Sequence, residues 1–492
     1  MSAEQDLRDA EHLQSLGYAQ ELWRRMGGFA NFAVSFSIIS ILSGGITSFD
    51  QGLAAAGPGE MGYGWPIVCV FSLLMAMAMA EIASSFPTAG GLYHWAAILG
   101  GRAWGWVTAW LNLIGLVTVL AAIDFGAVEF FLGWAGPTLG LDLAKMGPDT
   151  AQAVKVGLTL ACLVTQGLVN HMGIGLTAIL TDLSAWVHIV GALALTGSLW
   201  FFARHHPVGY LFEVQNLTAT SGVFPPTAST PWAFVLGFLM AAYTVTGYDA
   251  SAHTAEETMD AEHLVPWGMV MAVAVSGVFG WLMIGAITLA IPDLPATLRS
   301  GHAVVYVMEQ GLPRWLNLML LAIISAAQYF CGLATVTSAS RMIYAFARDG
   351  GLPGWQLWKQ VSPRFRTPAP AIWLSVGLAV VFTVCVKNYS TITCAATVAL
   401  YVSYAIPIAL GIFARGGRWA TPGVWSLGAF GRPVASIAVV WAVFVTVILV
   451  QPPNDLAGRV LAGCGAGLAA YWFGFARRHF RGPPAALLTG PR

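Results

Sequence analysis

The sequence predicts an all-α integral membrane protein with about twelve transmembrane helices. Hydrophobic residues make up 57% of the 492 residues and charged residues only 9%, whereas soluble domains contain about a quarter charged residues. Twelve stretches are apolar over roughly the 20 residues that a membrane helix needs. Strands are not expected, because these runs are too long and do not alternate apolar with polar residues.

The expected spans follow one another with short connections, apart from a loop of about 27 residues after the fifth span. They are 29–56, 65–86, 104–132, 155–172, 176–203, 231–250, 266–290, 316–345, 369–386, 391–414, 432–450 and 457–476.

The basic residues predict the orientation. If both termini lie inside, sixteen of the 23 Lys and Arg residues lie on the inner side and seven on the outer side. Cytoplasmic loops of membrane proteins carry such an excess. The polar start of the chain lacks the features of a signal peptide. We therefore expect a multi-pass protein of the cell (plasma or inner) membrane with cytosolic tails at 1–28 and 477–492.

Several function classes lack their sequence signals. The net charge of zero gives no indication of a nucleic-acid partner. An ATP-driven pump would need a P-loop, and none is present. No HExxH or GxSxG motif indicates a hydrolytic enzyme. The six cysteines form no CxxC pair, so neither a metal site nor a disulfide framework is expected. We expect no cofactor, no metal and no enzymatic activity.

Two of the expected spans, the first and the sixth, contain a run of poor helix formers. The first includes Ser43-Gly44-Gly45-Ile46-Thr47-Ser48, and the sixth includes Tyr243-Thr244-Val245-Thr246-Gly247-Tyr248-Asp249. Glycines beside hydroxyl residues disfavour a continuous helix. A break frees backbone groups, each costing several kcal/mol if unpaired in hydrocarbon. Breaks at these two places therefore favour a polar cavity, although the glycines alone are also compatible with close helix packing.

Breaks in corresponding spans are typical of a substrate site at the membrane midplane. We expect the amides of the outer half of the first span, capped by Thr47 or Ser48, to hold a carboxylate. Carbonyls of the sixth span and its two tyrosine rings suit an ammonium, and Asp249 is expected to cap the next half-helix. The predicted substrate-binding residues are Ser43, Gly44, Gly45, Ile46, Thr47, Ala242, Tyr243, Thr244, Thr246, Gly247 and Tyr248.

Four segments, in order, resemble amino acid permeases of the amino acid–polyamine–organocation (APC) superfamily, in the amino acid/choline (GABA permease-like) branch. They are Ser43–Ile46, Ala80–Tyr93, Gly247–Glu257 and Ser340–Gly350. The resemblance spans nearly the whole chain. It implies alternating access and substrates such as amino acids, 4-aminobutyrate (GABA), choline or polyamines.

The same resemblance implies a division of the chain. The first inverted five-helix repeat would occupy 29–203 and the second 231–414, with two extra helices within 432–476. This is the LeuT-like arrangement, in which helices 1 and 6 are broken.

Polar groups inside a membrane are functional candidates by default. The coupling or gating candidates are Glu81, Asp124, His188, Asp249, Glu256 and Thr335. Glu81 suits a structural or gating role beside an arginine or backbone amides, with proton carriage as the alternative. Glu256 and its neighbour Glu257 belong either to a gate or to a solvated helix end. Asp124 either attracts cationic amines in an outer vestibule or is a paired structural carboxylate.

The fifth span bears on the coupling ion. Some proton-coupled permeases of this superfamily carry a lysine there, but this span contains only Asp182 and His188 as ionisable residues. His188 either titrates in place of the lysine or is a hydrogen-bonded core histidine. Thr335 in the eighth span is a single hydroxyl where a sodium site often uses an adjacent pair, which disfavours sodium dependence.

The sequence thus predicts a secondary transporter that moves amino acids or related amines by proton-coupled symport. The predicted partners are the lipid bilayer, the small amine or amino acid, and a proton, with sodium as the alternative ion. Exchange of one solute for another is an alternative mechanism. A channel, or an amine-sensing receptor on a transporter scaffold, is the alternative from another class.

Overall fold

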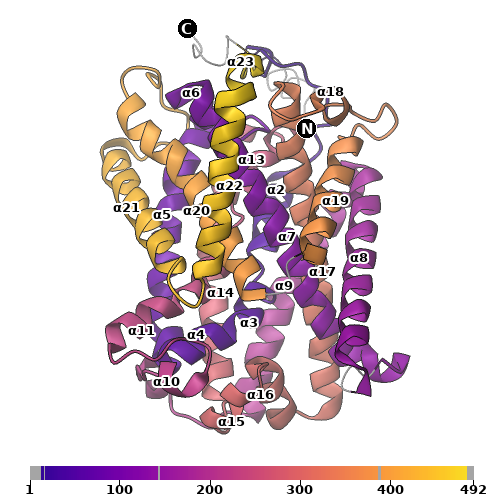
Figure 1. The fold of residues 1–492 in the computed structure, drawn as a ribbon, viewed down its shortest axis with the longest axis vertical. Coiled ribbons are helices and arrows are strands. Elements are labelled where there is room, and N and C mark those ends of the chain that lie inside the picture. Colours follow the sequence, from indigo (N-terminus) through magenta and orange to yellow (C-terminus); the bar gives the residue numbers. More distant parts are fainter. Residues whose placement is uncertain (1–10, 12, 16, 142–144, 386–388, 485–492) are drawn as a thin grey trace.

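The computed structural model describes residues 11, 13–15, 17–141, 145–385 and 389–484. Within these residues the regular structure is helical, apart from two isolated bridges (Figure 1). The main helices are α2 (Gly28–Ile39), α3 (Gly44–Thr47), α4 (Phe49–Ala56), η1 (Glu60–Gly64), α5 (Trp65–Ser85), α6 (Leu92–Gly100), α7 (Arg102–Leu139), α8 (Pro148–His171), α9 (Ile174–Phe202), α11 (Thr230–Gly237), α12 (Leu239–Thr244), α13 (Ala250–His253), η4 (Ala255–Glu257), α14 (Ala261–Leu289), α16 (Ala303–Gly311), α17 (Arg314–Arg348), α19 (Ala369–Cys385), α20 (Tyr389–Ala414), α21 (Gly431–Leu449) and α22 (Asp455–Tyr471). Short helices η3 (Val208–Phe212), α10 (Thr218–Ser221), α15 (Leu294–Arg299), α18 (Trp355–Trp358), η5 (Gly428–Phe430), η6 (Trp472–Ala476) and α23 (Arg477–His479) lie in the connections and near the C-terminus.

Ten helical segments of the described residues are long and apolar enough to cross a membrane. Two shorter apolar segments, Thr230–Thr244 and Ala369–Cys385, lie where the sixth and ninth spans are expected. The ten long helices confirm a helical membrane protein. The count of twelve depends on the two shorter segments and stays a prediction.

Several spans are longer than the sequence indicated, and the third and the eighth are the longest of them. The third was expected at 104–132 and the eighth at 316–345, but α7 has 38 residues and α17 has 35. At 1.5 Å per residue each is longer than the apolar layer of a bilayer is thick. The additional turns lie beyond the most apolar residues, where hydropathy alone does not mark a helix end.

The bundle has two ends with different connections (Figure 1). Helices α6, α18 and α23 gather at one end, which we call the α18 end, and α10, α15 and α16 gather at the other, the α16 end. The predicted tails at 1–28 and 477–492 lie partly outside the described residues. The part from residue 17 to Gly27 and the part up to 484 belong to the α18 end.

Helix α7 lies at the centre of the packing, in contact with α17, α20 and α6, while α14 packs against α5 and α2. Helix α22 is peripheral, because only 6% of its most apolar window is buried. Close approach at the centre depends on glycine. A Cβ on Gly115 of α7 would lie 2.6 Å from Leu400 Cδ2 and 3.2 Å from the Leu400 backbone nitrogen on α20.

This contact predicts the effect of two alanine substitutions. Gly115→Ala should destabilise the protein by about 1–3 kcal/mol, since the packed backbone of α20 has to move. Gly197→Ala on α9, where a Cβ meets nothing within 4 Å, should be neutral or stabilise by up to about 1 kcal/mol. Thermal unfolding of the purified protein in detergent measures both; equal effects would contradict the assigned packing.

Candidate functional site

The first membrane segment is interrupted earlier than the sequence indicated. Helix α2 ends at Ile39, Ser40–Ser43 are not helical, and α3 begins at Gly44. The expected break at 43–48 was therefore displaced by about one turn. Ser40 adopts a left-handed conformation with φ of 30°, which is uncommon for a residue other than glycine. The low helix propensity of Gly44 and Gly45 indicated the right region, but the helix already unwinds at Ser40, four residues before Gly44.

Side chains of α17 satisfy carbonyls that the first break frees. Gln328 Nε2 donates to the Leu42 carbonyl at 3.3 Å, and the Cys331 thiol donates to the Ile38 carbonyl at 3.4 Å. Such partners are required because an unpaired carbonyl is costly in an apolar interior. The break is thus tied to the eighth span.

The expected capping by Thr47 or Ser48 is wrong. Thr47 Oγ1 donates to the Ser43 carbonyl at 2.9 Å, and Ser48 Oγ donates to the Gly44 carbonyl and to the Met240 carbonyl at 3.2 Å. Because α3 leads almost directly into α4, each hydroxyl finds a carbonyl four residues behind it instead of a free amide ahead.

The second break occupies Val245–Asp249, between α12 and α13, within the predicted segment. Gly247 has φ of 87°, a conformation that favours glycine. Its amide donates to Tyr404 Oη at 3.0 Å, and the Tyr248 carbonyl accepts from Ser35 Oγ at 2.8 Å. Helices α20 and α2 therefore supply partners for the backbone groups of this break.

The two breaks touch at two glycines. A Cβ on Gly44 would lie 2.9 Å from Thr244 Cα, and one on Gly247 would lie 2.2 Å from Ile38 Cγ2. Gly45 differs, since its Cβ would meet Met283 and Trp65 only at 3.6 Å or more. Gly44 and Gly247 are therefore the glycines that allow the two broken segments to approach each other closely.

On the α18 side of the breaks, α2 is joined to α13 by polar side chains. Asn31 Nδ2 donates to the Ser251 carbonyl at 3.0 Å and to Thr258 Oγ1 at 2.9 Å. Ser35 Oγ contacts Ser251 Oγ at 2.7 Å and accepts from the Ser251 amide at 2.9 Å. These bonds make the two half-helices one mechanical unit.

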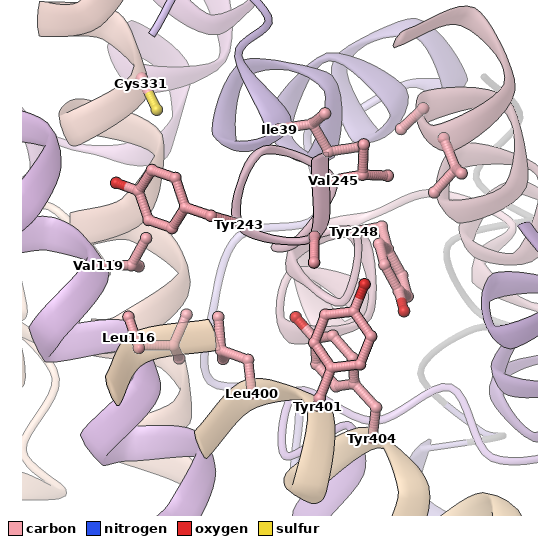
Figure 2. Packing of buried hydrophobic residues seen from close by; sticks show 14 of the residues in the cluster. Ile39, Leu116, Val119, Tyr243, Val245, Tyr248, Cys331, Leu400, Tyr401 and Tyr404 are labelled. Carbon is pink, nitrogen blue, oxygen red and sulfur yellow. The ribbon is translucent and has the colours of Figure 1, made fainter. Parts of the chain in front are cut away.

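The remaining predicted residues of the sixth span surround its turn. Ala242 is buried in α12, and the hydroxyls of Thr244 and Thr246 donate to the carbonyls of Met240 and Tyr243. Figure 2 shows Tyr243 extending toward α7 and α17, whereas Tyr248 lies toward the tyrosines of α20. The rings of Tyr248 and Tyr404 are 5.0 Å apart. The two aromatic side chains thus lie on opposite sides of the turn.

Asp249 does not cap α13, contrary to expectation. Its carboxylate accepts from Asn112 Nδ2 at 2.9 Å, Tyr404 Oη at 2.8 Å and His253 Nε2 at 3.2 Å. The side chain turns away from the helix start because three neighbouring donors compete for it. His253 was not anticipated, although its i,i+4 spacing from Asp249 places both on one helix face.

His188 lies beside the first break. Its Nδ1 is 2.8 Å from the Ser184 carbonyl, which only accepts, so Nδ1 carries a proton. Its Nε2 is 2.6 Å from Ser40 Oγ and accepts from this hydroxyl when the ring is neutral. A neutral ring therefore satisfies both contacts, which favours the hydrogen-bonded alternative over a titrating group.

Asp124 of α7 lies against α8 and α17. It is fully buried, and its Oδ1 accepts from Gln166 Nε2 at 2.7 Å, so the paired alternative is favoured. A cavity of about 330 Å³ at the α16 end is lined by the next turn of α7, including Glu129, and by Ile46 and Thr47. Glu129, which was not anticipated from the sequence, pairs with Lys155 at 2.6 Å.

Thr335 gives no indication of a sodium site. Its hydroxyl donates to the Cys331 carbonyl, four residues earlier in α17, at 2.8 Å. Among the described residues, no three His, Cys, Asp or Glu side chains come together as metal ligands.

Ion pairs close the bundle between the second break and the α18 end. Glu257 binds Arg341 through two bonds of 2.8 and 2.9 Å, and Glu256 binds Arg348 through bonds of 2.8 and 3.0 Å. Both glutamates are fully buried, so the solvated-helix-end alternative is wrong. Glu81 is paired with Arg415 in the same way.

The N-terminal segment around Tyr18, which we call the strap, crosses this end of the bundle. Tyr18 Oη donates to Asp349 at 2.8 Å, and the Arg348 guanidinium lies 3.8 Å from the Tyr18 ring centre. Burial and the Asp349 carboxylate raise the pKa of the Tyr18 hydroxyl, which therefore stays a proton donor. The α18 end is thus closed by η4, α17 and the strap together.

Known proteins are similar to this sequence along nearly its full length. Residues 26–462 match the family described as amino acid permease. The chain is 34% identical to the amino-acid permease BAT1 of Arabidopsis thaliana, over 97% of this chain and 96% of that protein. It belongs to the amino acid permease family. The resemblance seen in the sequence is confirmed, and this permease is a multi-pass membrane transporter and not an enzyme.

Two further relatives also align with nearly the whole of this permease. The BAT1 homolog of Oryza sativa subsp. japonica is 32% identical over 96% of this chain and 94% of that protein. The GABA-specific permease of Saccharomyces cerevisiae is 27% identical over 99% of this chain and 88% of that protein.

The buried ion pair at the α18 end generates a stability prediction. Arg341→Met should destabilise the permease by about 3–5 kcal/mol, because Glu257 is left buried without its counter-charge. The double variant Arg341→Met/Glu257→Gln should recover much of this loss. Arg459→Met, which removes an exposed pair with Asp455, should change stability by less than about 1 kcal/mol. Thermal unfolding in detergent compares the three; a harmless Arg341→Met would show that the pair is not needed.

Proposed function

We propose that this permease is a secondary active transporter that imports amino acids or related amines such as GABA by alternating access, driven by protons. The observation that carries the proposal is the contact between two broken helices, flanked by a cavity on one side and buried ion pairs on the other. Transporters place their substrate between such breaks, near the bilayer midplane.

The proposed topology has twelve spans, with inverted repeats at 29–203 and 231–414 and two further helices within 432–476. Both termini and the α18 end would face the cytoplasm of the cell, in accordance with the distribution of Lys and Arg. The cavity at the α16 end would then open outward, and the ion pairs of Glu256 and Glu257 would form the closed inner gate.

We assign the substrate to the junction of the breaks. Backbone amides of the first break and of the start of α3 would hold a carboxylate, with Ser43, Gly44, Gly45, Ile46 and Thr47 lining that side. The Ser43 and Gly44 amides themselves donate to the Ser40 carbonyl at 2.9 Å and so fix the shape of this backbone. Tyr243 and Tyr248 would flank the amine. Ala242, Thr244, Thr246 and Gly247 would form the wall next to them.

The names of the relatives support the substrate class. BAT1 is named as an amino-acid permease and the yeast relative as a GABA-specific permease. An amino acid and GABA share a carboxylate and an ammonium, and this is the pair of groups that the junction suits.

Uptake into proteoliposomes tests the proposal. A panel of labelled amino acids, GABA, choline and polyamines is offered with and without an inward proton gradient, in the absence of sodium. We expect one class of compound to accumulate and a protonophore to abolish its accumulation. Exchange without accumulation would indicate an antiporter instead, and a passive flux that does not saturate would indicate a channel. No flux with any compound would contradict transport.

The adjacent glycines of the first break provide a matched pair of variants. Gly44→Ala should lower uptake at least about tenfold, because its Cβ would lie 2.9 Å from Thr244 Cα and push the two breaks apart. A loss of about 1.4 kcal/mol in the binding free energy of the substrate corresponds to this factor. Gly45→Ala should keep most of the uptake, since its Cβ has room. Initial rates and substrate affinity are measured for both, with thermal unfolding as the folding control. Equal uptake by the two variants would contradict the site.

We assign His188 a gating role, in which it positions Ser40 and the first break. His188→Ala should slow uptake about tenfold, in line with the loss of a hydrogen bond worth about 1 kcal/mol and the freed Ser40 hydroxyl. The remaining uptake should still depend on the proton gradient. If that dependence disappears, His188 is itself the coupling group and the gating role is wrong.

A further inference from the structure

One buried carboxyl group has no role in the site described above. Glu60 lies in η1, at the start of the second span, and its side chain is fully buried. Neither of its carboxyl oxygens has a hydrogen-bond partner among the described residues. Glu81, Glu256, Glu257 and Asp249 all differ, since each accepts at least two hydrogen bonds.

Glycines make the space that this carboxyl group occupies. A Cβ on Gly64 would lie 2.1 Å from Glu60 Oε1, and one on Gly237 would lie 2.5 Å from Glu60 Oε2. A Cβ on Gly52 would lie 3.2 Å from Glu60 Cγ. Gly52 belongs to α4 and Gly237 to α11, so the carboxyl group lies where the α16-side halves of both broken helices meet.

The elements packed against η1 bring no cation to Glu60. Helices α4, α5, α11, α14 and η3 contact it. Helix α11 has no ionisable residue, and the acid of α4, Asp50, accepts from the Ala303 amide at 2.8 Å. The acids and the histidine of α5 and α14 lie at the α18 end, and α5 also carries the thiol Cys69, which is never a cation. Helix η3 contributes only Tyr210, and Glu213 beyond η3 is exposed.

An ionised carboxylate in such a place is unfavourable, because no opposite charge or donor replaces its water. The protonated acid fits the closed arrangement far better. When α4 and α11 separate, water can enter and hydrate the carboxylate. Protonation of this group is therefore linked to the closure of the two half-helices.

We propose that Glu60 is the proton-carrying group of this permease. In the open arrangement, a hydronium ion from the α16 side donates a proton to the carboxylate, forming the O–H bond and leaving water. The neutral acid allows α4 and α11 to close. The proton returns to water after the opposite side opens, and the electron pair of the O–H bond stays on the carboxylate oxygen. This proposal rests on the proton-driven transport proposed above.

Glu60→Gln tests the assignment, since glutamine mimics the neutral acid in size. In proteoliposomes it should exchange labelled for unlabelled substrate, but the substrate should equilibrate across the membrane without accumulating when a proton gradient is imposed. Addition of substrate should no longer acidify the lumen, as reported by a trapped pH dye. Glu213→Gln, the same change at an exposed neighbouring site, should behave as the wild type.

The outcomes separate the two proposals. If wild-type protein shows no gradient-driven accumulation, proton coupling itself is wrong. If the wild type accumulates substrate and Glu60→Gln does so equally, only the role of Glu60 is wrong. Should Glu60→Gln lose all transport, infrared difference spectra of the solubilised proteins decide: the carbonyl stretch of a protonated carboxyl group must be present in the wild type and absent from the variant. Without this band the proposal fails.

Discussion

A backbone amide or carbonyl left unpaired inside a membrane is costly, and the centre of this permease is arranged around that constraint. Two helices are interrupted there, and their freed groups find partners on α2, α17 and α20. The same groups tie the breaks to one another and to the surrounding bundle. The breaks are consequently ordered structures with fixed geometry, which is what a binding site made of backbone requires.

The polar side chains around the breaks divide the two broken helices into unlike halves. On the α18 side, Asn31 and Ser35 join α2 to the sixth segment, and buried pairs with arginines hold this unit closed. On the α16 side, contacts between α4, α11 and η1 are apolar or involve glycine, apart from the uncompensated Glu60 and the weak bond from Ser48. One end is therefore held by charge pairs and the other by packing that a single proton can alter.

Hydropathy and glycine content predicted much of this architecture, because the membrane imposes its length and its solvent on each span. Ten of the spans and the two broken helices followed from these signals, whereas the family followed from the resemblance of four segments to known permeases. The atomic partners did not, since they depend on which side chains approach in space. Thr47 and Ser48 bond backward because α3 and α4 are nearly continuous, and Asp249 turns toward Asn112, Tyr404 and His253. Glu60 stands near a span edge, where its complete burial between two half-helices leaves no local sequence signal.

The most direct test of the account is a structure of the permease with its transported substrate bound. We predict that the carboxylate lies beside the backbone of Ser43 and Gly44, and that the amine lies against the turn from Tyr243 to Gly247. The half-helices α4 and α11 should then be closed over the ligand. Substrate bound only in the cavity beside Glu129, with the junction of the two breaks unoccupied, would contradict the central claim.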